Sequence, residues 1–128
     1  MPCAVEEAGG TLKYLSSRDF DRVEIPEGEA ITSWPLVSAA LETDVLINVP
    51  IAKTHGTAGL TMAMKNLYGI LGGNRGKLHR DMGENIADLA GGFRSDLVVI
   101  DAFRVLVRNG PVGGRLSDVE LRQTVIAS

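Results

Sequence analysis

Two short apolar runs constrain the fold of this chain more than any other feature. Residues 45–49 read Val-Leu-Ile-Asn-Val and are closed by Pro50, and residues 97–100 read Leu-Val-Val-Ile. Continuous apolar runs of this length are typical of strands that are covered on both faces, as in parallel sheets. We therefore expect two neighbouring central strands, over Asp44–Val49 and Asp96–Ile100.

A helical pattern lies between the two runs. Leu60, Met64, Leu67 and Leu71 recur at i, i+4, i+7 and i+11, which is one face of a helix over Gly59–Leu71. Strand, helix and strand in this order predict an α/β fold with a mostly parallel central sheet, helices on both faces and a right-handed crossover. The chain's length of 128 residues fits a single domain, residues 1–128.

Weaker patterns predict the remaining elements. The N-terminal third has short apolar runs and little periodicity, so the order of strands over residues 11–33 stays open. We expect strands at Thr11–Leu15, Arg22–Ile25 and Leu121–Ser128, a helix entered at Ser33–Pro35, and a short helix at Asn85–Ala90.

Composition excludes several classes of protein. A net charge of −3 argues against a general nucleic-acid-binding surface. No apolar run approaches the roughly 20 residues of a membrane span, and the acidic N-terminus is unlike a secretory signal, so we expect a cytoplasmic protein. Cys3 is the single cysteine. The chain alone can therefore form no internal disulfide and hold no iron–sulfur cluster through several thiolates.

The first candidate site follows the first apolar run. In open α/β sheets, ligands bind beyond the carboxyl ends of the strands, and this position holds Lys53, Thr54 and His55. Lys53 supplies a fixed positive charge and His55 one that changes near neutral pH. The pattern favours a phosphate or carboxylate site. The alternative is an ordinary loop with a surface histidine, in which Thr57 caps the following helix.

The second candidate site follows the other apolar run. Asp101 comes directly after this strand, where a carboxylate serves as a proton acceptor or metal ligand, or simply caps the strand end. Further on, Gly110 and Gly113 belong to a glycine-rich loop. Its backbone N–H groups could form an anion-binding concavity. The alternative is a tight turn.

Basic residues in and after the predicted helix form a third candidate site. Lys65 and Asn66 lie off its apolar stripe, and Arg75 and His79 belong to the basic segment Asn74–Arg80. These side chains could bind a phosphate or carboxylate, or they could face solvent. His55, His79 and Asp101 together would also suit a metal ion, although only the fold could bring them together. The phosphate-loop and dinucleotide-binding fingerprints are absent from the sequence.

Several of these segments together resemble one family. Asp44–Gly56, Met64–Gly69 and Leu97–Ala102, followed by Gly110-Pro111 and Gly113-Gly114, resemble in this order the motifs of the family called domain of unknown function 362. The resemblance implies an α/β fold that is part of a larger family fold, and it implies no settled activity. Some members carry an added ferredoxin-like iron–sulfur module. Members are usually longer at both ends, so we expect a fragment of a longer domain.

Two hypotheses for function follow. In the first, the chain is an enzyme or enzyme fragment that binds a small anionic substrate, with His55 and Asp101 as catalytic residues and Lys53 and Lys65 holding the anion. In the second, it is a non-catalytic regulatory or docking module of an iron–sulfur redox protein. The second hypothesis predicts an exposed apolar edge or face, covered by a second copy in a homodimer or by flanking segments.

Overall fold

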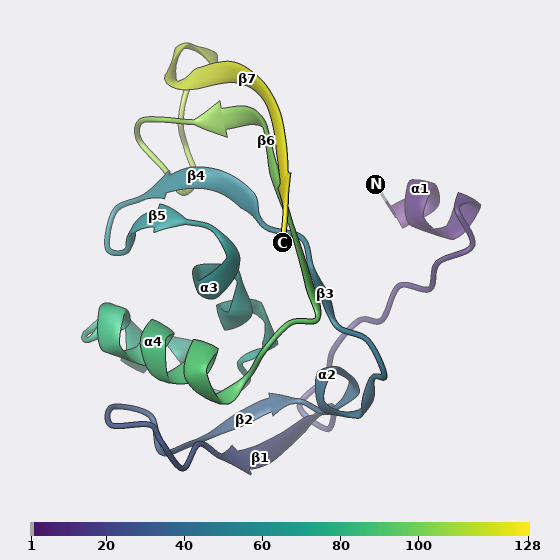
Figure 1. The fold of residues 1–128 in the computed structure, drawn as a ribbon, viewed down its shortest axis with the longest axis vertical. Coiled ribbons are helices and arrows are strands. Elements are labelled where there is room, and N and C mark those ends of the chain that lie inside the picture. The colour runs from purple at the N-terminus through teal and green to yellow at the C-terminus, as the bar shows by residue number, and fades with distance from the viewer. Residues whose placement is uncertain (1) are drawn as a thin grey trace.

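The computed structural model describes residues 2–128, which form four α-helices, three 3₁₀ helices and seven strands (Figure 1). The helices are α1 (Pro2–Glu7), α2 (Ser38–Glu42), α3 (Ala63–Asn66) and α4 (Met82–Gly92), with 3₁₀ helices η1 (Leu67–Ile70), η2 (Arg75–His79) and η3 (Leu116–Asp118). The strands are β1 (Phe20–Glu24), β2 (Ser33–Val37), β3 (Ile47–Asn48), β4 (Ile51–His55), β5 (Gly59–Thr61), β6 (Leu97–Leu106) and β7 (Val119–Ala127).

The larger sheet is mixed, with a parallel centre. β3 and β4 both run parallel to β6, and Ile47, Asn48 and Ile51 each pair with the residue 50 positions further along the chain. This constant offset makes β3 and β4 two parts of one extended stretch against the same edge of β6. β5 pairs antiparallel with β4, and β7 pairs antiparallel with β6. The predicted α/β class and the parallel pairing of the two apolar runs are confirmed.

The principal core lies between the helices and a separate two-stranded ribbon. β1 and β2 pair antiparallel in this ribbon, which lies along one side of α4 (Figure 1). The buried side chains of the core are Ile25, Ile31, Leu36, Leu67, Tyr68, Leu71, Leu78, Met82 and Leu89. A smaller cluster of Ala52, Ile100 and Ala102 lies within the larger sheet. The core therefore fixes η1 and η2, which carry several of the candidate site residues.

The helix predicted to start at Ser33–Pro35 is wrong, because these residues belong to β2. Pro35 pairs with Arg22, and its carbonyl accepts a hydrogen bond from the Gly72 amide. Trp34 Nε1 donates to the Gly72 carbonyl. Proline lacks a backbone N–H, and Pro35 needs none here, because it contributes only its carbonyl to the contact with Gly72 on the edge of β2 away from β1. The tertiary contacts with Gly72 therefore decide the conformation, and the helix begins only at Ser38.

The single helix predicted over Gly59–Leu71 is also wrong. The segment divides into β5, α3 and η1. Its first residues form a hairpin with β4, in which Lys53 pairs with Thr61 and His55 with Gly59. Backbone pairing with β4 overrides the helical spacing at this end of the segment.

The expectation that helices cover both faces of the sheet is wrong for the described residues. On the β3–β4 stretch Asn48, Pro50 and Ala52 are buried, whereas Ile47, Val49 and Ile51 are 52%, 60% and 51% exposed. α3 and α4 pack over the side of Asn48 and Val98. The opposite side is an open sheet face formed by Ile47, Val49, Ile51, Leu97 and Val125, by register and exposure.

The weaker expectations have mixed outcomes. Strands near Arg22–Ile25 and Leu121–Ser128 are confirmed as β1 and β7, and the short helix extends into α4. Thr11–Leu15 forms no strand, and much of the basic segment after residue 74 is the 3₁₀ helix η2. Within residues 2–128, no helix combines the length and apolar character needed to cross a bilayer.

Candidate functional site

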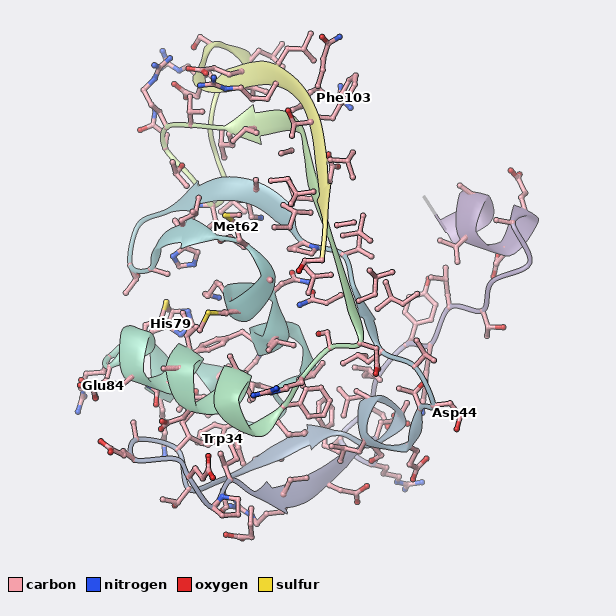
Figure 2. All side chains as sticks on the ribbon, viewed as in Figure 1. Trp34, Asp44, Met62, His79, Glu84 and Phe103 are labelled. Carbon is pink, nitrogen blue, oxygen red and sulfur yellow. The ribbon has the colours of Figure 1, made fainter. Side chains whose placement is uncertain are left out.

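A cleft of about 950 Å³ lies beside β4 and is lined by basic side chains from residues 53–79. Its lining includes Lys53 and His55 of β4, Lys65 of α3, and Arg75 and His79 of η2. Three segments that lie apart in the sequence therefore bring their positive or titratable side chains to one place. His79 lies between α4 and the β4–β5 hairpin in Figure 2.

Among residues 2–128, no aspartate or glutamate lines this cleft. The salt bridges within the described part of the chain involve Lys13, Arg108 and Arg122, and none of the cleft residues. Lys53, Lys65 and Arg75 thus concentrate positive charge in a chain whose net charge is −3. Such clustering of one sign in a concave site attracts ligands of the opposite sign.

His55 is held as a neutral imidazole by its surroundings. Its Nδ1 accepts hydrogen bonds from the backbone amides of Thr57 and Ala58, each at 3.2 Å. Burial lowers the pKa of His55, and the charges of Lys65, His79 and Lys53 lower it further. Because Nδ1 is the acceptor, the proton of the neutral ring lies on Nε2. His55 can therefore donate a hydrogen bond without carrying a charge.

Lys65 is placed by an aromatic ring. Its Nζ lies 4.3 Å from the centroid of the Tyr68 ring, within the range of a cation–π contact. Burial lowers the pKa of Lys65, and the nearby charges of Arg75 and Lys53 lower it further. An anion in the cleft would relieve the mutual repulsion of these cations.

Tyr68 joins the two 3₁₀ helices that flank the cleft. It is buried in the principal core, and its hydroxyl donates to the Leu78 carbonyl at 3.3 Å. Its ring meets that of His79 edge to face at 6.2 Å between centroids. Arg75 Nη1 donates to the Tyr68 carbonyl at 3.5 Å. Tyr68 is therefore a positioning residue for Lys65, Arg75 and His79.

A pair of asparagines connects α3 to the central sheet. Asn66 Nδ2 donates to Asn48 Oδ1 at 2.8 Å, and Asn48 Nδ2 donates to the Ala63 carbonyl at 3.0 Å. Asn48 is buried on β3, whereas Asn66 lines the cleft. This connection fixes α3, and with it Lys65, relative to the strands.

The predicted ligand residues Thr54, Gly110 and Gly113 do not line the cleft. Thr54 Oγ1 instead accepts a hydrogen bond from the Gly110 amide at 3.2 Å. A Cβ at Gly110 would lie 2.1 Å from the Thr54 carbonyl oxygen, so only glycine allows this approach. The contact brings the following residues, Pro111 and Val112, into the cleft lining.

The family described as Domain of unknown function (DUF362) matches residues 1–128. This chain belongs to the DUF362 family. It is 30% identical over 131 aligned positions to the thylakoid-associated protein sll1697 of Synechocystis sp.. The alignment covers 91% of this chain and 41% of that relative, so the chain spans less than half of the relative's length. No solved structure matches it.

Asp101 lies outside the cleft of this DUF362 chain. It is exposed on β6, beside Ile51 and Val125 in register, and its Oδ1 accepts a hydrogen bond from the Phe103 amide at 3.0 Å. The structure thus brings His55 and His79 together in one cleft but does not add Asp101. Within residues 2–128, no group of three or more His, Cys, Asp or Glu side chains is arranged to hold a metal ion.

Sequence reasoning missed several residues of the site. Asn48 could have been identified from the sequence, because it is the one polar residue inside an apolar strand. The sequence indicated Tyr68 more weakly, since Tyr68 follows Lys65 at the i+3 spacing that brings helical side chains together. Nothing in the sequence indicated Pro111 and Val112, because their position depends on the contact between Gly110 and Thr54.

Proposed function

We propose that this DUF362 chain binds a small molecule with a phosphate or carboxylate group in the cleft beside β4. The observation that supports this is the convergence of Lys53, Lys65 and Arg75 on a cleft that no acidic residue lines in the described part of the chain. Charge-assisted hydrogen bonds from lysine and arginine to such groups are among the strongest in proteins.

The proposal gives each side chain a role. Lys65 and Lys53 supply point charges, and Arg75 supplies a planar group that can hold two oxygens at once. Neutral His55 donates from Nε2, because its Nδ1 is already occupied by the Thr57 and Ala58 amides. This favours a binding role for His55 over that of a general base. With Asp101 outside the cleft, we assign the site binding and no particular reaction.

Calorimetric titration with inorganic phosphate and diphosphate tests the proposal. Lys65→Ala should weaken binding by about tenfold or more, because a hydrogen bond to a charged group contributes about 1.5–3 kcal/mol. Lys77→Ala is the matched control. Lys77 is exposed on the same 3₁₀ helix as Arg75 but lies outside the cleft, and its loss changes the net charge equally.

The two variants separate a specific site from general attraction. Affinity should fall for Lys65→Ala and stay within about twofold of the unmodified chain for Lys77→Ala, since exposed charges contribute little. Equal weakening by both variants would show attraction by net charge alone and would reject the proposal. Absence of binding at millimolar phosphate and diphosphate would reject it as well.

A further inference from the structure

One wall of the cleft changes from aliphatic to basic along a single extended stretch. Val49, Ile51, Lys53 and His55 all line the cleft. Ile51, Lys53 and His55 are two positions apart on β4, and side chains so spaced on a strand point to the same side, about 7 Å from one another. The aliphatic part of the wall is therefore adjacent to the basic part.

We propose that the ligand is an anionic amphiphile: a head group with at least two negative charges, such as a diphosphate, joined to an aliphatic chain. This inference rests on the proposed function, since it places the head group among the same cations. The head group lies at Lys53, Lys65 and Arg75. The aliphatic chain lies along Ile51 and Val49.

The charges in the cleft favour a head group with more than one negative charge. Lys53, Lys65 and Arg75 carry three positive charges, and none of them has a carboxylate partner in the described part of the chain. A single monoanion would leave most of this repulsion in place. A diphosphate offers enough charge and oxygen atoms to contact several of these groups at once.

The exposed aliphatic wall favours a chain over a nucleobase. Val49 is 60% and Ile51 51% exposed, and Ile47 continues the same row beyond the cleft at 52%. Exposed aliphatic side chains gain stability when an apolar group covers them. None of these side chains has a donor or acceptor that could read the edge of a base.

Asp101 sets the orientation of such a ligand. It is exposed and pairs with Ile51 in the register of β4 and β6. Its carboxylate therefore repels an anion from the aliphatic part of the wall, whereas Lys53 attracts it to the basic part. The head group and the chain consequently have one favoured direction along the strand.

Titration with methyl diphosphate and hexyl diphosphate, both as dissolved monomers, tests this inference. Hexyl diphosphate should bind at least about tenfold more tightly, because each buried methylene contributes favourably. Ile51→Ser, and independently Val49→Ser, should remove most of this advantage by weakening the binding of hexyl diphosphate more than that of methyl diphosphate. Val125→Ser is the matched control, because Val125 is exposed on the open sheet face but outside the cleft.

Each outcome decides a separate point. If neither compound binds, the proposed function fails together with this inference. If both bind equally, or if Val125→Ser removes the advantage as Ile51→Ser does, the anion site stands and the aliphatic wall is rejected. Tighter binding of a nucleoside diphosphate than of hexyl diphosphate would also overturn the inference, as would equally tight binding of hexanol, which lacks the head group.

The same chemistry could come from a free metabolite or from a membrane lipid. Co-sedimentation with phosphatidate vesicles that is lost in Lys65→Ala would support a lipid source. Binding of dissolved hexyl diphosphate without vesicle binding would support a free molecule. Both results agree with an amphiphilic ligand, and the co-sedimentation measurement distinguishes a lipid from a free molecule as its source.

Discussion

The Gly110 amide donates a hydrogen bond to Thr54 Oγ1 at 3.2 Å, which holds the loop after β6 against the end of β4. The contact is close enough to exclude any side chain at Gly110. It brings Pro111 and Val112 to the cleft, so one backbone contact between distant segments completes part of the lining.

Gly110→Ala should destabilise the fold by about 2 kcal/mol or more, because the added methyl group forces the loop away from β4. Gly83→Ala is the control. Gly83 lies in α4 with nothing within 4 Å of an added Cβ, so this change should be neutral or stabilising by up to about 1 kcal/mol. Urea unfolding measures both. Equal stability of the two variants would contradict the close contact.

Asn48→Ala should cost about 1–3 kcal/mol, because it leaves the Asn66 amide and the Ala63 carbonyl without their side-chain partner. A double-mutant cycle with Asn66→Ala measures the coupling. If the two asparagines interact as the structure shows, the double variant should be more stable than the sum of the single effects indicates. Strictly additive effects would contradict the hydrogen bond between them.

Asp118 should make the chain sensitive to acid. Its carboxylate accepts hydrogen bonds from Asn109 Nδ2, the Arg115 amide and Arg108 Nε, and these partners hold its pKa below the ordinary 3.8. A depressed carboxyl pKa adds stability above the unfolded-state pKa, and this stability is lost as the pH falls through the folded-state value.

Comparison with Asp118→Asn tests whether the charge of Asp118 stabilises the fold above its pKa. Thermal unfolding should show the unmodified chain more stable than Asp118→Asn at pH 6, with the difference shrinking as the pH falls below about 4. A difference that stays constant across this range would contradict the proposed role of the charge. Because Asp118 holds the segment from Asn109 to Arg115, the variant should also loosen Val112 at the cleft.

Much of the site could be predicted from residue type and position. Lys53 and His55 follow an apolar strand, and Lys65 lies off the apolar stripe of its segment. These local signals agree with the cleft that the structure forms. Asp101 also follows an apolar strand, but β6 continues to Leu106, so this residue lies within the strand and not at its end.

The remaining features depend on tertiary contacts that a local pattern does not contain. The spacing of Leu60 and Met64 is helical, yet pairing with β4 and the short α3 leave both about half exposed. The apolar run at residues 45–49 suggests two covered faces, yet one stays open in the described part of the chain. The docking role, the homodimer and the iron–sulfur association stay predictions.

His55 should titrate below the ordinary value of 6.5, because burial and the nearby Lys65 both lower its pKa. Lys65→Ala should raise this pKa toward the ordinary value by removing one nearby charge, with burial still holding it down. An NMR titration of the ring protons measures the pKa in both chains. A lower pKa in Lys65→Ala than in the unmodified chain would contradict the arrangement of the cleft.

The most direct test of the account is the same NMR titration of His55 with and without saturating diphosphate. An anion bound among Lys53, Lys65 and Arg75 should raise the pKa of His55, because nearby negative charge favours the charged form of the ring. The rise should persist in Lys77→Ala and be lost in Lys65→Ala. An unchanged pKa of His55 at a diphosphate concentration that saturates binding would place the anion elsewhere and contradict the central claim.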